Sequence, residues 1–258
     1  MKIQCLGVHD SLAPGKGSMC LLIDGTLALD AGAITDTLPF EQQVTIRDVI
    51  VSHVHIDHVK TLPFLAESFA ISFTGNIVQT LRVHAKPAII RALKAHLFNN
   101  VLWPDFTTIP SVADPVLTLI DQGQTFVVQG YTITFIPLTH TVPTYAIHVQ
   151  HRDSEFLYIS DTGPTERIWQ YINQLERPLD AIFIDVAFPN SLENLAWASG
   201  HLTPKLLRAE LGKVTNIPKH MYAIHLKSVY IEKISKELVS ALDGYDYSIP
   251  KPMDILTL

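Results

Sequence analysis

Short apolar runs separated by turn residues recur along the chain, and they predict β-strands. The first two runs, residues 3–8 and 20–23, precede the hairpin turn signal Asp24-Gly25 and a partner strand at 26–29. Further strands are expected at residues 48–52, 125–128, 131–136, 145–149, 156–159, 180–184 and 221–224. Apolar residues at helical spacing predict helices at residues 87–98, 165–174 and 204–211, and the Pro-rich stretch 103–115 is expected to be irregular.

Both halves of the chain therefore combine strands with helices. This pattern favours two β-sheets packed face to face and covered outside by helices, although by itself it leaves other α/β arrangements open. The length of 258 residues predicts a single domain spanning residues 1–258. No apolar run approaches the roughly 18 residues of a membrane span, and the first residues do not form a signal peptide. We therefore expect a cytoplasmic protein without a membrane partner.

Composition directs attention to the histidines. The formal net charge of −6 argues against a general nucleic-acid surface, which normally carries a basic stripe, so no stable nucleic-acid partner is expected. The two cysteines, Cys5 and Cys20, are expected to be reduced core residues. Twelve histidines against 19 lysines and arginines is a high proportion, which makes histidine the residue to follow.

The densest group of histidines lies in residues 52–58, Ser-His-Val-His-Ile-Asp-His, directly after an apolar run. Three imidazoles and a carboxylate within six positions form a nitrogen and oxygen cluster suited to zinc. In an extended chain His53 and His55 point to the same side, and a turn would bring Asp57 and His58 round to face a second ion. A coincidental group of surface histidines is the alternative.

Three more apolar runs end in a side chain of the same kind. His140 follows residues 131–138, Asp161 follows 156–160, and His225 follows 221–224. One loop cannot supply all the ligands of two ions, and ligands at the ends of core strands are held rigidly. Together with the first cluster, these three residues make up a complete two-metal set.

The H-x-H-x-D-H cluster, the distant histidine, the Asp-Thr-Gly at 161–163 and the final histidine resemble the metallo-β-lactamase superfamily. The resemblance extends from Asp30 to His225 and implies an αββα sandwich of two mixed β-sheets with helices outside. It implies that Asp30 orients a ligand histidine without touching metal. It also implies two zinc ions, with manganese or iron as alternatives, and assigns their ligands. One ion would be held by His53, His55 and His140, the other by Asp57, His58 and His225, with Asp161 bridging them.

Three local segments narrow the resemblance to class II cyclic-nucleotide phosphodiesterases. They are residues 96–106, 160–164 (Ser-Asp-Thr-Gly-Pro) and 199–204 (Ser-Gly-His-Leu-Thr-Pro), in the expected order. The implied reaction is attack of a metal-bridging hydroxide on the phosphorus of a 3′,5′-cyclic nucleotide, giving the 5′-monophosphate. The resemblance favours cAMP and admits cGMP. Residues 59–61, Val-Lys-Thr, depart from the pattern, since relatives commonly carry a glycine at this turn.

His201 lies just before a helix start, because Thr203-Pro204 reads as an N-cap followed by the first helical residue. By analogy with related tRNA 3′-processing nucleases, His201 could donate a proton to the leaving oxygen, with Asp185 holding its other ring nitrogen. His201, Asp185 and the metal ligand Asp57 are thus the expected catalytic residues. The alternative for His201 is a capping or packing role.

The other candidate residues are open to simpler explanations. Asn99, Trp103 and Phe106 could bind a purine, or their segment could form a homodimer contact. His148 is expected to be packed in a strand, and His9 could approach the site. The remaining histidines His84, His151 and His220 are expected at the surface or in turns.

Other functions of the same fold remain as alternatives. A tRNA 3′-processing endonuclease shares the metal set but should carry a basic, Gly/Pro-rich arm, which this acidic chain lacks. Thiol-ester hydrolysis and lactamase chemistry do not account for residues 199–204. A non-catalytic module would be expected to have lost a ligand, and none is missing.

Overall fold

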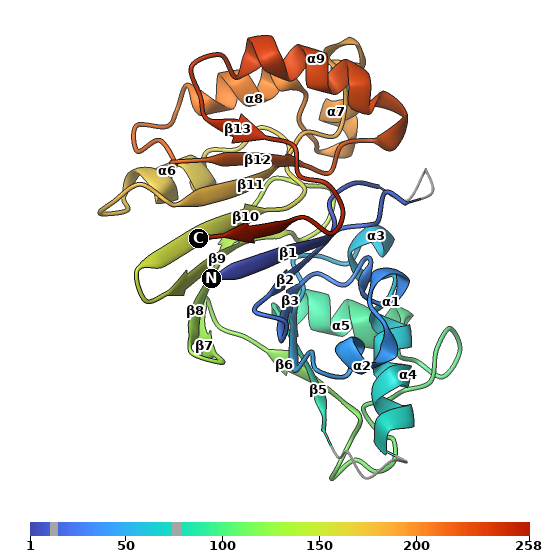
Figure 1. Cartoon of the computed structure of the whole chain (residues 1–258). Coiled ribbons are helices and arrows are strands. Elements are labelled where there is room, and N and C mark those ends of the chain that lie inside the picture. The colour runs from blue at the N-terminus through green and yellow to red at the C-terminus, as the bar shows by residue number, and fades with distance from the viewer. Residues whose placement is uncertain (11–14, 74–78) are drawn as a thin grey trace.

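The computed structural model describes residues 1–10, 15–73 and 79–258, and its framework is a pair of facing β-sheets of seven strands each (Figure 1). In spatial order, the first sheet contains β14 (Ile255–Thr257), β1 (Lys2–Gly7), β2 (Cys20–Ile23), β3 (Leu27–Leu29), β4 (Asp48–Ile50), β5 (Leu81–Ala85) and β6 (Leu117–Asp121). The second contains β13 (Tyr247–Ser248), β12 (Met221–Ile224), β11 (Ala181–Asp185), β10 (Ser154–Ile159), β9 (Tyr145–His151), β8 (Tyr131–Pro137) and β7 (Thr125–Val128).

Helices cover the outer face of each sheet (Figure 1). On the first sheet lie α1 (Ile34–Thr37), α2 (Phe40–Gln43), α3 (Ile56–Val59), α4 (Leu62–Phe73) and α5 (Pro87–His96). On the second lie α6 (Arg167–Asn173), α7 (Glu193–Ser199), α8 (Pro204–Leu211) and α9 (Ile231–Ala241), with short 3-10 turns at Asn190–Leu192 and Ser228–Tyr230. The predicted αββα sandwich is therefore confirmed.

The alternation of side chains along the strands divides the core into three layers. In β10, Phe156 and Tyr158 belong to the cluster between the two sheets, whereas Leu157 and Ile159 pack under the helices of the second sheet. Successive strand residues point to opposite faces, so a strand buried on both faces must be apolar throughout. Cys5 and Cys20 are both buried and free, which confirms their prediction as reduced core residues.

Parallel pairing determines where the loops gather. Strands β3 to β6 run parallel in the first sheet, and β10 to β13 run parallel in the second. Because parallel strands end at the same edge of a sheet, the loops after β4, β10 and β12 emerge side by side. These are the loops that carry the candidate ligands.

Some elements have no clear pattern in the sequence. Helices α4 and α9 and strands β5, β6 and β14 were not predicted, and each forms by packing against a neighbour distant in the chain. The irregular stretch at 103–115 is confirmed, since no helix or strand is assigned within these described residues. Among the described residues no helix is long and apolar enough to cross a membrane.

The prediction that His84 lies at the surface or in a turn is wrong. His84 is buried in β5, and its Nε2 lies 2.6 Å from Oδ1 of the buried Asp48. Arg82 and Gln129 also donate to this carboxylate. A buried carboxylate needs several donors, so tertiary pairing holds the imidazole inside.

We predict that Asp48→Asn lowers the free energy of unfolding by about 2 kcal/mol, because charge-assisted hydrogen bonds become neutral ones. In the folded protein the pKa of Asp48 falls to about 2, since the hydrogen bonds from His84 and Arg82 outweigh the opposing effect of burial. The stabilisation is therefore present above the unfolded-state pKa near 4 and is lost as the pH falls towards 2. Urea unfolding at pH 7 and pH 3 measures both effects. Equal stability of variant and wild type at pH 7 would contradict the prediction.

Candidate metal centre

The histidine cluster folds as an extended segment followed by one helical turn. His53 and His55 lie in extended chain after β4, and His55 is the residue immediately before α3, which contains Asp57 and His58. Lys60 has right-handed helical dihedrals (φ −50°), so this turn does not require the glycine found in relatives. The turn packs closely on residue 32, where a Cβ would lie 2.0 Å from the Asp57 carbonyl oxygen, so Gly32 is required there.

The structure brings all seven predicted ligands together. In three groups of side chains the ligand atoms lie within 4.8 Å of one another, and one of the three adds His201 to Asp161 and His225. The predicted ligands make up the other two groups, with His53, His55, His140 and Asp161 in one and Asp57, His58 and His225 in the other. The Asp161 carboxylate lies between them: Oδ2 is 3.5 Å from His53 Nε2, and Oδ1 is 3.1 Å from His58 Nε2 and 3.6 Å from His225 Nε2. This is the position expected of a bridging carboxylate.

The donor atoms fit metal ions better than they fit one another. His53 Nε2, His58 Nε2 and Asp161 Oδ1 are buried and have no hydrogen-bond partner among the described residues. Unpaired buried polar atoms are costly, and a divalent cation would satisfy all three. Burial also lowers the pKa of His53 to about 4, which keeps its imidazole neutral, as ligation requires.

Asp161 is charged in spite of its burial. Burial opposes ionisation, but the surrounding rings of His225, His58 and His53 hold the pKa of its carboxyl well below the usual range. Nitrogen and carboxylate-oxygen donors in this number suit zinc, and they also suit manganese or iron.

Hydrogen bonds outside the cluster orient the ligand rings. Asp30 Oδ2 accepts from His58 Nδ1 at 2.7 Å, from Ser52 Oγ at 2.7 Å and from the Tyr158 hydroxyl at 2.8 Å. Each histidine held through Nδ1 presents Nε2 to the centre. The structure thus places Asp30 where the resemblance implies, behind His58 and not among the ligand atoms.

The segment at 199–204 contacts the cluster directly. His140 Nδ1 donates to the Gly200 carbonyl oxygen at 2.8 Å. Gly200 ends α7 at φ +69°, and a Cβ there would lie 2.8 Å from His140 Nδ1, so both the conformation and the contact demand glycine. The side chain of Thr203 accepts from Leu206 N, which confirms it as the N-cap of α8.

His201 and Asp185 form the expected pair beside the ligands. His201 Nδ1 donates to Asp185 Oδ2 at 2.9 Å, and the His201 ring stacks on His225 with centroids 5.1 Å apart. Burial opposes ionisation of Asp185, but His201 and His225 lower the pKa of its carboxyl below the ordinary value. The dyad therefore consists of a fixed carboxylate and an imidazole whose second nitrogen remains available.

The structure does not bring the predicted purine-binding residues to this cluster. Asn99 accepts from the amides of residues 101 and 102 after α5, Trp103 makes an edge contact with Phe64, and Phe106 is buried under the first sheet's helices. Their local contacts account for these residue types by packing and capping. Their role in substrate binding remains a prediction without support from these contacts.

Sequence reasoning missed two neighbours of the site. The Phe188 ring lies 5.7 Å from the His201 ring, and the Lys227 ammonium lies 6.0 Å from the centroid of Phe188. In the sequence, Phe188 could have been found only from its position soon after the buried strand β11, and Lys227 only from its position two residues after His225. His9, expected to be able to approach the site, is buried and pairs through its backbone with Leu226.

Comparison with known proteins gives the class of protein. Residues 21–226 match the model of the beta-lactamase superfamily domain, and the chain belongs to this family. No curated protein matches the chain in sequence.

Solved structures extend the likeness over the whole described fold. Yeast PDE1 is similar at a TM-score of 0.83 with 18% identity, covering 100% of this chain and 99% of its own. Zn²⁺-bound PqqB from Methylobacterium extorquens has a TM-score of 0.71 with 15% identity and 100% coverage of both chains. The short form of human tRNase Z has a TM-score of 0.66 with 16% identity, covering 100% of this chain and 99% of its own. At these identities the likeness shows the fold alone.

We predict that Asp161→Ala lowers the metal content of the purified protein by roughly half or more, because one carboxylate serves both ligand groups. Mass spectrometry of the metal measures this directly. Asp246→Ala is the matched control, since this side chain is 74% exposed and, among the described residues, pairs with His220 away from the cluster. Undiminished metal in Asp161→Ala, with circular dichroism showing an intact fold, would remove Asp161 from the ligand set.

Proposed function

We propose that this protein is a metal-dependent phosphodiesterase that hydrolyses 3′,5′-cyclic nucleotides to 5′-monophosphates, with cAMP favoured and cGMP admitted. The observation that carries the proposal is the His201–Asp185 dyad stacked on His225, beside groups of histidine and aspartate side chains that could hold metal ions. A proton donor next to such a set suits the cleavage of a diester whose leaving group is a poor alkoxide.

The proposed division of ligands is the one stated for the family resemblance. His53, His55 and His140 would hold one ion and Asp57, His58 and His225 the other, with Asp161 as a ligand shared by the two groups. When bound, two such ions supply Lewis acidity to the phosphate and lower the pKa of a bound water. Zinc is the favoured metal, with manganese or iron as alternatives.

The chain's own residues supply the remaining chemistry. Asp185 fixes the tautomer of His201 by accepting from Nδ1, which leaves Nε2 to hold or release the proton that the leaving 3′ oxygen needs. The contact of His140 with Gly200 joins the dyad's loop to the ligand set. A shift of this loop would therefore disturb proton donor and ligand together.

The choice of a cyclic nucleotide rests on the sequence segments at 160–164 and 199–204. Both segments lie at the centre: the first contains Asp161, and the second contains Gly200 and His201. The fold likeness to yeast PDE1 agrees with this choice but does not establish it.

The second candidate is a tRNA 3′-processing endonuclease, favoured by the fold likeness to human tRNase Z. The net charge of −6 disfavours it, because a tRNA surface demands a basic footprint. We also propose that the protein is cytoplasmic, forms a single domain and assembles as a homodimer.

The deciding experiment measures hydrolysis of 3′,5′-cAMP, cGMP, bis(p-nitrophenyl) phosphate and a precursor tRNA by the zinc-loaded protein. We expect chelator-sensitive conversion of cAMP to 5′-AMP, because the ligand set and the dyad together suit a cyclic diester. Turnover of the generic diester with cAMP untouched would discard the cyclic-nucleotide assignment. Cleavage of the precursor tRNA alone would favour the second candidate.

We predict that His201→Ala lowers kcat for cAMP by roughly 10²- to 10⁴-fold, the range for loss of a general acid. Metal content should stay at the wild-type level, because His201 contributes to the centre as a proton donor. Steady-state kinetics and metal analysis on the same preparation separate the two effects. Equal loss of metal and kcat would make His201 a structural residue.

A further inference from the structure

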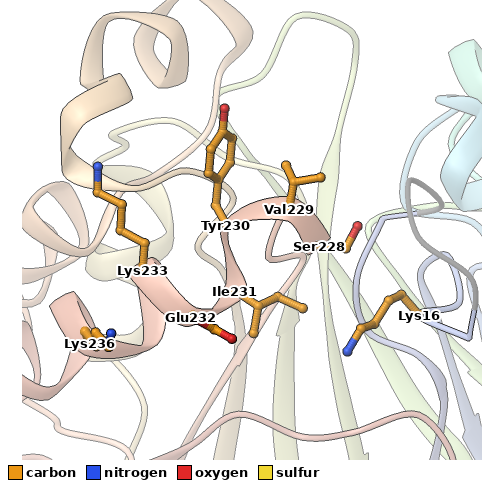
Figure 2. A pocket seen from close by; sticks show the side chains of 8 residues that line it. All are labelled: Lys16, Ser228, Val229, Tyr230, Ile231, Glu232, Lys233 and Lys236. Carbon is orange, nitrogen blue, oxygen red and sulfur yellow. The ribbon is translucent and has the colours of Figure 1, made fainter.

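A second feature of the structure is a pocket of about 590 Å³ at the start of α9. Figure 2 shows its walls, with Lys16 on one flank and the side chains of Lys233 and Lys236 on the other. Ser228 and Tyr230, from the short turn that leads into α9, lie between them. None of these residues belongs to the ligand set or the dyad.

The pocket is cationic in a chain that is acidic as a whole. Three lysines line it against one carboxylate, Glu232, while the chain has a net charge of −6. Among the described residues, no carboxylate lies within 4.0 Å of the Lys16 or Lys236 ammonium, whereas Lys233 donates to Ser191 Oγ.

Two chain segments, 8–10 and 225–228, link the pocket to the metal cluster. The His225 amide donates to Val8 O at 2.7 Å, and His9 pairs with Leu226, so the chain after His225 is held against the chain after β1. Ser228 Oγ donates to Asp10 Oδ1 at 2.5 Å, which continues this contact. On the other side, the His9 amide donates to Gly17 O at 3.2 Å and places Lys16 next to His9.

Ser228, which lines the pocket, follows the predicted ligand His225 by three residues, so this segment runs from the cluster to the pocket. Lys227, whose ammonium lies over Phe188, adds a further cation on the same short segment. Cations that are not neutralised by the protein attract and orient anionic groups of a substrate. A 3′,5′-cyclic mononucleotide has only one phosphate, and that phosphate would bind at the metal centre.

We propose that the pocket binds a second phosphate group of the substrate. This inference rests on the proposed phosphodiesterase function and refines its substrate class. The centre accepts cyclic mononucleotides, but a cyclic dinucleotide, which carries two phosphates, binds more tightly. Lys16 and Lys236 are the residues that distinguish the two substrates.

The test compares KM and kcat of the zinc-loaded protein for 3′,5′-cAMP and for cyclic di-AMP, which share the same base. In the wild type we expect KM to be roughly tenfold lower for cyclic di-AMP, the value of about one charge-assisted hydrogen bond. In Lys16→Met/Lys236→Met this tenfold difference should disappear. The matched control, Lys94→Met/Lys251→Met, removes two exposed lysines outside the pocket and should keep the difference.

The failure of this inference differs from the failure of the proposed function. Equal KM values for the two substrates in the wild type, or a difference that survives in Lys16→Met/Lys236→Met, would overturn the inference while cAMP turnover continues. If no diester is hydrolysed, calorimetric titration of cyclic di-AMP into the chelator-treated protein tests phosphate binding in the pocket independently of catalysis. Binding that weakens roughly tenfold in the lysine variant supports the pocket, and binding that does not weaken refutes it.

Discussion

The interaction on which the site depends is that of the Asp161 carboxylate with the four imidazoles around it. His53, His58, His140 and His225 all present a ring nitrogen within 4.0 Å of this buried group. A buried charge is tolerated only where opposite charge and hydrogen-bond donors surround it. The buried carboxylate therefore depends on the rings around it for its stability, and the remainder of the fold holds these groups in place.

That arrangement requires both sheets. His53, His55, Asp57 and His58 follow β4 of the first sheet, whereas His140, Asp161 and His225 follow strands of the second. The apolar layer between the sheets brings the two sets of strand ends to one edge. Tyr158 links this layer to the site, because its ring packs between the sheets and its hydroxyl donates to Asp30, which orients His58. Core packing and ligand geometry are thus coupled through one side chain.

Two kinds of chemistry meet at the side of His225. Its ring stacks on His201, which pairs with Asp185, and the chain after it leads into the lysine pocket. A short segment thus presents a candidate metal ligand, a neighbour of the proposed proton donor and one wall of a cationic pocket. Several functional groups on one short segment are typical of sites at strand ends, where a rigid scaffold positions loops of variable sequence.

The choice of the sandwich among other α/β arrangements rested on the family resemblance, whereas the sequence by itself determined most central strands and the ligand candidates. These depend on local signals, namely apolar runs of strand length, turn residues, and histidine or aspartate at the ends of the runs. Tertiary structure decided what local spacing cannot encode. His84 is inside because Asp48 is buried beside it, and Phe106 packs under a helix layer although its motif suggested substrate contact. Helix α9 and the lysine pocket depend on segments more than 200 residues apart, joined by Asp10 and Ser228. Such pairings arise only when distant segments meet, because their free energy comes from contacts that do not exist until the chain is folded.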